Sequence, residues 1–386
     1  RPAHGDHAEE PLALLQREPV RHERPEHHRR EQVEDAEPDE EHHPAHLADR
    51  LGRGDEDGVE SVEAEGDEDA EDRENPGTTV RPLDRQLSSS AAFGEKPALG
   101  RDDLFERIGD LAQQGNKLIF TTSFGYMNQT QKVAKQFPDV KFVHSTGYKT
   151  APNVATTNAR FYESRYLAGV LAGKMTKSNV VGYVGAHPIP EVLQGINAFA
   201  IGLKSVNPEA QVRVVWANSW YDPGKERDAA VTLLGQGADV VTHHTDSTAT
   251  VQAAEEAGKY AIAYHSDMSK FGPKAQLAAV THHWGDYFTR KATEVLDGKW
   301  QNDSTWGGLK SGMAALEGFG PEVPADVKEF VLAKQAEIEA GTLQPFAAPI
   351  KDNDGKVRLE SGFLDDDALN RMDYYVEGVA SKLPKQ

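Results

Sequence analysis

Residues 239–266, DVVTHHTDSTATVQAAEEAGKYAIAYHS, contain two short apolar runs with an amphipathic stretch between them. The outer runs, DVVTHH and YAIAYHS, have the length and apolar content of buried strands. The middle stretch, TATVQAAEEAG, has helical spacing and ends at a glycine. A strand, a helix and a second strand in this order are the repeating unit of a parallel sheet covered by helices. The stretch therefore predicts an α/β fold.

The same alternation continues on both sides of this stretch, from about residue 101 onward. A long helix is predicted from about Ala159 to Met175, and strands are predicted at KLIFTT, KFVHST, VVGYVGA, QVRVVWA and AAVTHHW. Continuous apolar runs such as VVGYV are typical of parallel strands that are buried on both faces. A chain of 386 residues is long enough for two such domains.

Residues 1–97 have a different composition. The first 95 residues contain no lysine, no aromatic side chain precedes Phe93, and acidic residues dominate. Such a segment buries too little apolar surface to offset an ordering entropy of about 1 to 2 kcal/mol per residue, which predicts disorder. A second interpretation is that the segment is GC-rich DNA translated in a wrong frame. Its bias toward Arg, Pro, Ala, His and Asp resembles that case.

Composition and charge argue against several functional classes. The formal net charge is -20, which disfavours nucleic acid or an anionic membrane surface as a partner. The chain has no cysteine, so disulfides, thiolate metal ligands and a thiol nucleophile are excluded. The sequence as given contains no apolar run of membrane-spanning length and no secretion signal.

Polar and aromatic side chains gather just after the predicted strands. Ligands of parallel sheets bind beyond the carboxyl ends of the strands, so these positions are candidates for binding. The candidates are Phe124 and Tyr126 after KLIFTT, Trp220 after QVRVVWA, Asp246 after DVVTHH, Asp267 after YAIAYHS, and Trp284 after AAVTHH. Aromatic faces beside carboxylates suit a flat, hydrogen-bonding heterocycle such as a purine.

Some of these residues also have a structural interpretation. Trp220 and Trp284 are each open to a role in core packing. Asp222 precedes a proline and a helical run, which favours an N-cap over a ligand contact. Asp246 and Ser247 precede a helix, where binding an anion and capping the helix are equally compatible with the pattern.

The paired histidines His243–His244 and His282–His283 do not predict a metal site. Adjacent residues of a strand point to opposite faces, so each pair offers only one ring to a common site. The sequence also lacks the GxSxG, P-loop and HExxH motifs, and no GxGxxG follows a strand. We therefore expect neither a metal, a cofactor nor enzymatic activity.

Five segments closely resemble the BMP family of basic membrane lipoproteins, the purine nucleoside receptor-like substrate-binding proteins of ABC transporters. They are KLIFTTSFGYM, NARFYESRYLAGVLAGKM, NSWYDPGKERDAA, QGADVVTHHTDST and YYVEGV. The resemblance implies a type I periplasmic-binding fold in which two lobes joined by crossover strands close on a purine or nucleoside. Applied to this chain, it predicts a first lobe at 98–178, a second lobe at 179–279, and a crossover and C-terminal segment at 280–386.

The resemblance also extends to single residues. Trp220 falls on the family's aromatic position before Asp-Pro, where the nucleobase stacks. The family's Asp-Ser-Asp segment reads His265, Ser266, Asp267 here, so a histidine replaces one acid, and a lysine common near His283 is absent. Both departures weaken the case for ribose recognition and favour a free base such as adenine. Asn158, His265 and His283 complete the set of predicted ligand residues.

The resemblance further implies a permease and an ATPase as partners, and a place in the periplasm or on the outer face of the plasma membrane. We expect a monomer that binds no nucleic acid. The family's lipoprotein signal, first strand and aromatic loop are not seen upstream, so we expect an incomplete first lobe and weaker ligand binding. The alternatives are a purine-acting enzyme such as a nucleoside hydrolase, or a ligand sensor with the same two-lobed fold.

Overall fold

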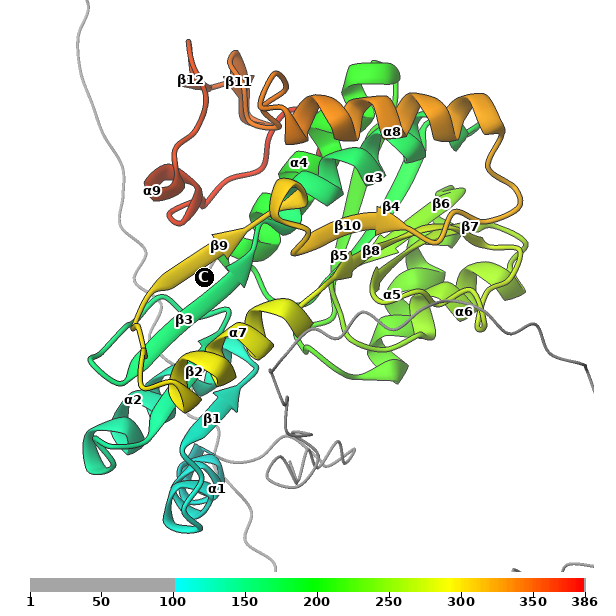
Figure 1. Cartoon of the computed structure of the whole chain (residues 1–386). Coiled ribbons are helices and arrows are strands. Elements are labelled where there is room, and N and C mark those ends of the chain that lie inside the picture. The colour runs from blue at the N-terminus through cyan, green and yellow to red at the C-terminus, as the bar shows by residue number, and fades with distance from the viewer. Residues whose placement is uncertain (1–100, 385–386) are drawn as a thin grey trace, which may run out of the picture. The chain divides into compact units, whose positions relative to one another are not determined.

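The computed structural model describes residues 101–384, with side chains from Leu104 onward. The predicted disorder of residues 1–97 lies outside the described residues. The described part contains a four-stranded sheet, a six-stranded sheet and a small two-stranded sheet (Figure 1). Among residues 101–384, no helix combines the length and apolar character needed to cross a membrane.

The four-stranded sheet is parallel throughout. Its strand order is β1 (Leu118–Thr121), β2 (Lys141–Ser145), β3 (Val154–Ala159) and β9 (Ser304–Gly307). Helices α1 (Arg101–Gln113) and α2 (Met127–Gln136) share one apolar cluster with it, and α7 (Gly285–Leu296) shares another. On α1, Leu104 and Ile108 are buried and Leu111 packs beside them.

The six-stranded sheet has the order β10-β8-β7-β6-β4-β5, in which only β10 runs antiparallel to its neighbour. These strands are β4 (Val180–Gly185), β5 (Gln211–Trp216), β6 (Val240–His243), β7 (Tyr260–His265), β8 (Gln276–His282) and β10 (Ala314–Glu317). As predicted, β4 and β7 are apolar runs buried along most of their length. Two separate apolar clusters pack against this sheet.

Helices cover both faces of the six-stranded sheet. One cluster includes residues of α3 (Phe161–Met175), α4 (Pro190–Val206) and α8 (Ala325–Glu339). The other includes residues of α5 (Pro223–Gly235) and α6 (Ala249–Glu256). Because α3 packs on this sheet, the chain leaves the four-stranded sheet at the end of β3. The predicted lobe boundaries stay predictions.

Helices α3 and α4 pack so closely that glycine is required where their backbones meet. A Cβ atom on Gly169 would lie 2.0 Å from the Phe199 carbonyl oxygen, and one on Gly202 would lie 2.1 Å from that of Tyr166. No side chain fits at those distances. The sequence RYLAGVLAG thus serves helix-to-helix contact, which fixes α4 and the loop before it against the sheet.

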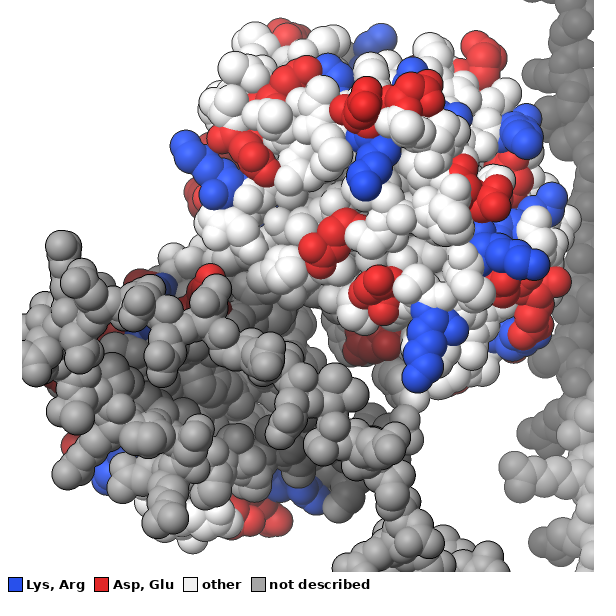
Figure 2. All heavy atoms as spheres, turned by 45° about the vertical axis from the view of Figure 1, so that its right-hand side comes forward, with Lys and Arg blue, Asp and Glu red and all other residues white. Residues whose placement is uncertain are grey.

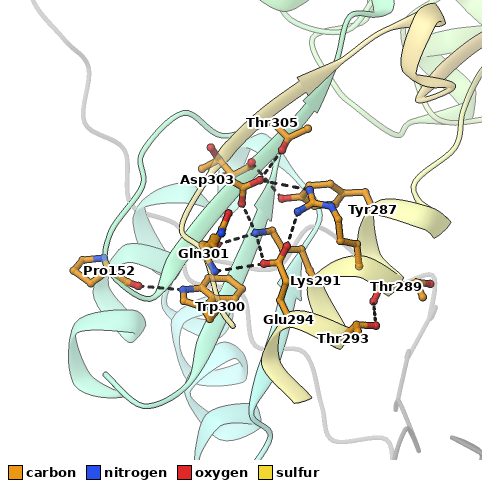
Figure 3. A network of polar contacts seen from close by, with 12 residues as sticks. Pro152, Tyr287, Thr289, Lys291, Thr293, Glu294, Trp300, Gln301, Asp303 and Thr305 are labelled. Carbon is orange, nitrogen blue, oxygen red and sulfur yellow. Dashed lines mark hydrogen bonds and ion pairs between the residues drawn. The ribbon is translucent and has the colours of Figure 1, made fainter. Parts of the chain in front are cut away.

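A buried lysine fastens α7 to the strand that follows it (Figure 3). The Lys291 side chain is 0% exposed, and its Nζ donates to Glu294 Oε2 at 2.8 Å and to the Gln301 carbonyl at 2.7 Å. It also pairs with Asp303, which precedes β9. Burial pushes the pKa of Asp303 up, but hydrogen bonds from Lys291 and Thr305 hold it below its usual value.

The C-terminal segment runs back along β5. It contains β11 (Ile350–Lys351), β12 (Val357–Leu359) and α9 (Asp366–Leu369). Two short helices, η2 (Phe124–Tyr126) and η3 (Leu309–Ser311), lie elsewhere in the chain. Backbone hydrogen bonds join Val212 to Gly378 and Ala380, and Tyr375 is 1% exposed. The end of the chain is therefore part of the core of the six-stranded sheet.

Strand β3 was not predicted from the sequence. Its residues, VATTNA, include two threonines and an asparagine, and five of the six are buried between β2 and β9. The partner β9 lies nearly 150 residues further along the chain, as the pairing of Thr156 with Ser304 shows. Local propensity carried no sign of this long-range pairing.

Candidate functional site

Polar and aromatic side chains meet at the carboxyl ends of the six-stranded sheet. Strands β4, β6, β7 and β8 are parallel, so the residues that follow them share one edge. We call this group the carboxyl-end cluster; its members are Glu191, Trp220, His244, Asp246, Tyr264, His265 and His282. Three of them, Trp220, Asp246 and His265, were predicted as ligand residues.

One part of the cluster is a chain of three polar side chains. His265 Nε2 lies 2.8 Å from Asp246 Oδ1, and its Nδ1 lies 3.0 Å from His282 Nε2. Burial, together with the charges of His265 and Arg165, lowers the pKa of His282 well below its usual value. His282 is therefore neutral, and His265 lies within hydrogen-bond distance of both neighbours. Asp246 and His265 are partly exposed, at 45% and 37%.

Glu191 forms the second polar part of the cluster, at the start of α4. Asn158 Nδ2, on β3 of the other sheet, donates to Glu191 Oε2 at 3.0 Å. Glu191 Oε1 lies 3.7 Å from His244 Nε2, beyond hydrogen-bond distance. Burial raises the pKa of Glu191 to about 7, against the opposing effects of the Asn158 hydrogen bond and the His265 charge. The carboxyl thus changes its protonation near neutral pH.

His244 cannot serve as the counter-charge of Glu191. Its Nε2 lies 3.0 Å from the Tyr264 hydroxyl, and burial raises the pKa of Tyr264 well above its usual value. Tyr264 thus stays protonated and donates to His244. Burial, followed by the charge of Arg165, lowers the pKa of His244 well below its usual value, so the ring stays neutral.

Arg165 contacts residues of β6 and β7 beside the cluster. Its side chain is fully buried on α3, where it donates to Thr242 Oγ1 at 3.0 Å and to the His243 carbonyl at 2.6 Å. The guanidinium carbon lies 4.0 Å from the centroid of the Tyr264 ring, within cation–π distance. Arg165 therefore fixes Tyr264 and the end of β6.

Trp220 supplies an aromatic surface beside the polar groups. Its ring centroid lies 5.1 Å from that of His187 and 6.2 Å from that of His244. The Trp220 carbonyl accepts a hydrogen bond from the Asp246 backbone at 2.8 Å, which joins the two strand ends. The side chain is partly buried against the core, so it combines packing with a position at the cluster.

Asn158 contacts the cluster through its hydrogen bond to Glu191. The other five predicted ligand residues are not members of the cluster. Asp267 accepts from Gln276 Nε2 at 2.7 Å and from the Ser269 backbone, and His283 lies 3.4 Å from Glu317. Trp284 stacks on Phe288, although its ring centroid is also 6.1 Å from that of His282. The remaining two, Phe124 and Tyr126, lie in η2 after β1. Their roles stay predictions.

The structure also decides between alternatives at two helix starts. Asp222 is an N-cap, as predicted, because its carboxylate accepts from the Lys225 backbone at 3.1 Å. Ser247 donates to Glu226 at 2.6 Å and accepts from the Ala249 backbone, so its hydroxyl serves the start of α6. Asp246, by contrast, faces His265.

Sequence reasoning missed Glu191 and the arrangement of the histidines. Glu191 follows VVGYVGA in the segment HPIPEV, and the rule that selected the other strand ends applies to this one too. His244 was considered only as a metal ligand. Within residues 101–384, no group of three or more His, Asp or Glu side chains is arranged to hold a metal ion.

Comparison with known proteins identifies the class. Two helix-covered sheets, one finished by a strand from late in the chain, form the type I periplasmic-binding fold. A solute-binding protein of an ABC transporter system from Aeropyrum pernix has this fold; the two structures align with a TM-score of 0.56 at 18% identity, over 65% of this chain and 83% of that one. Residues 85–344 match the model of the family described as Bmp, ABC transporter substrate-binding protein PnrA-like. The chain belongs to this family.

Two curated relatives cover most of the chain. A purine-binding protein of Brucella abortus is 52% identical over 295 residues, which are 76% of this chain and 83% of the relative. A protein of Haloferax volcanii, named for ABC transporter glucose binding, is 38% identical over 280 residues, 72% of this chain and 69% of the relative. The chain is therefore a substrate-binding component of an ABC transporter, a class that delivers a small molecule to a permease and an ATPase.

Proposed function

We propose that this protein binds a purine base or nucleoside, with adenine as the best-fitting ligand, for uptake across the inner membrane. The carrying observation is that the Trp220 ring adjoins hydrogen-bonding groups of the carboxyl-end cluster. An aromatic face beside a carboxylate and imidazoles matches a flat base with polar edges. The 52% identity to a protein named as purine-binding supports the same ligand class.

In this proposal the protein binds its ligand without transforming it. It acts in the periplasm or on the outer face of the membrane, as a monomer, and transfers the ligand to its permease. Trp220 stacks on the base, while Asp246 and His265 contact its polar edge. The replacement of a family aspartate by His265 favours a free base over a ribose-bearing nucleoside.

Titration calorimetry with adenine, adenosine and glucose tests the ligand class. We expect the complete chain to bind adenine most tightly, adenosine more weakly and glucose least. Glucose is included because one relative is named for it. Binding of glucose with no response to either purine would overturn the proposal. Native mass spectrometry of the purified protein provides a second test, since a co-purified base would appear as a defined added mass.

A further inference from the structure

The Oε1 atom of Glu191 has no hydrogen-bond partner among the described residues. Oε2 is held by Asn158, whereas Oε1 is 3.7 Å from a histidine nitrogen that already accepts from Tyr264. The side chain is 15% exposed, so this oxygen is within reach of a small molecule at the cluster. The same His244 ring lies beside Trp220, on which the base is proposed to stack.

We propose that Glu191 is a specificity-determining residue that recognises a ring nitrogen of the bound purine. This inference rests on the proposed function. A protonated carboxyl donates a hydrogen bond and therefore matches an unprotonated ring nitrogen, as in adenine. An ionised carboxylate only accepts, and so matches a ring N–H, as in hypoxanthine. Adenine has an unprotonated N1 where hypoxanthine has N1–H, so at this position the two ligands require opposite states of one side chain.

The surroundings of Glu191 favour the donating state up to near neutral pH. The groups that act on it are Asn158 from β3, His244 after β6, and Tyr264 and His265 of β7. His244 and His282 are neutral, and Arg165 is bonded to Thr242 and to the His243 carbonyl. Glu191 therefore has no charged partner in direct contact within this part of the chain.

The expected signature is an opposite response of two ligands to pH. As pH rises from about 6 to about 8.5, ionisation of Glu191 should weaken adenine binding roughly tenfold and leave hypoxanthine binding unchanged or stronger. Glu191→Gln removes the ionisation but keeps a donor and an acceptor, so it should abolish the pH dependence of the affinity ratio.

The experiment is titration calorimetry of the complete chain with adenine and with hypoxanthine across this pH range. Glu163→Gln is the matched control: Glu163 is a partly buried carboxyl whose pKa is raised by burial, and it accepts from the Leu309 backbone rather than from the cluster. The control should keep the wild-type profile. Glu191→Leu, which has no polar group, should weaken adenine binding about tenfold at the low-pH end.

Three outcomes are informative. The inference is supported if the ratio of adenine affinity to hypoxanthine affinity falls with pH in the wild type and stays constant in Glu191→Gln. A ratio that still falls in Glu191→Gln, or that does not change in the wild type, overturns it while the purine function stands. If neither purine binds the wild type at any pH while the protein is folded by circular dichroism, the proposed function fails and the inference fails with it.

Discussion

At the scale of single residues, Trp220 carries the largest expected share of ligand binding. Replacing it with alanine removes a stacking face and part of the buried surface, so affinity for adenine should fall by roughly 1 to 3 kcal/mol. Titration calorimetry measures this directly. Phe363→Ala is the control, because Phe363 is 60% exposed and lies in the C-terminal segment. An unchanged dissociation constant in Trp220→Ala would remove this residue from the site.

Glu191 should also make the stability of the protein depend on pH. Burial raises its pKa from the ordinary 4.5 to about 7, so the folded state binds the proton more tightly than the unfolded state. Its contribution is fully present below about pH 4.5 and is lost as pH rises through about 7. Between about pH 5 and pH 8, the wild type should lose on the order of 2 kcal/mol relative to Glu191→Gln in urea unfolding. Parallel stability profiles would contradict this.

The residues of the cluster show where sequence reasoning succeeds and where it stops. The rule that parallel strands place their carboxyl ends together predicted that Trp220 and Asp246 lie near one another, and their backbones are hydrogen-bonded. His265 was selected through the resemblance to the family's Asp-Ser-Asp segment. Asp267 follows the same rule but bonds to Gln276 instead, because the backbone at His265 takes a left-handed turn with φ of 72°. That conformation is rare outside glycine and cannot be inferred from the letters HSD.

At the scale of elements, the contact between α3 and α4 makes an unusual mutational prediction. Alanine normally stabilises a helix relative to glycine by about 0.5 to 1 kcal/mol. Gly202→Ala should nevertheless destabilise the protein by roughly 2 to 3 kcal/mol, because the new Cβ atom would lie 2.1 Å from a carbonyl oxygen. Gly109→Ala in α1, where nothing lies within 4 Å, should be neutral or stabilising. Chemical denaturation of both variants checks the contrast.

Helix α7 should depend on its buried lysine. Lys291→Met leaves the Glu294 and Asp303 carboxylates beside an apolar side chain, which should cost about 2 to 3 kcal/mol of stability. Lys299→Met is the matched control, because Lys299 is 75% exposed and pairs with Asp297 at the surface. That change should stay within about 0.5 kcal/mol. Equal effects of the two substitutions would show that burial does not matter here.

The elements themselves were mostly predictable, because β4 through β8 are apolar runs bounded by amphipathic helices. Strands β3, β9 and β10 were not predicted, and the polar residues of β3 are buried through pairing with β2 and β9. The ion pairs that hold α7 against the segment before β9 were also not predicted from the sequence. Nothing in the sequence around Lys291 marks this lysine as the one that becomes fully buried between two carboxylates.

At the scale of the whole molecule, surface charge is evenly mixed where it is visible. Basic and acidic side chains alternate over the face shown in Figure 2. The contacts between the two sheets are instead specific: Asn158 reaches Glu191, and Arg160, at the start of α3, pairs with Asp366 at 2.7 Å. A ligand that binds Glu191, as proposed, would therefore act on the hydrogen bond that joins β3 of one sheet to α4 on the other.

The C-terminal segment should be essential for stability. A chain ending at Gly362 loses Leu369, Tyr375 and Val376 from the core of the six-stranded sheet, and all three are at most 2% exposed. We expect it to unfold at a much lower temperature, with a broader transition, in calorimetry. A chain ending at Leu383 keeps these contacts and should melt like the wild type. A cooperative, unshifted transition in the shorter chain would contradict this role.

The late pairing of β9 with β3 has a consequence for biosynthesis. Both sheets lack a strand until residues 304–317 have been made, because β9 joins one and β10 joins the other. On the ribosome, neither sheet can be completed while the first three quarters of the chain emerge, and unpaired strand edges stay exposed during that time. Folding should therefore follow chain release, and the nascent protein should depend on factors that shield apolar segments until its last quarter is synthesised.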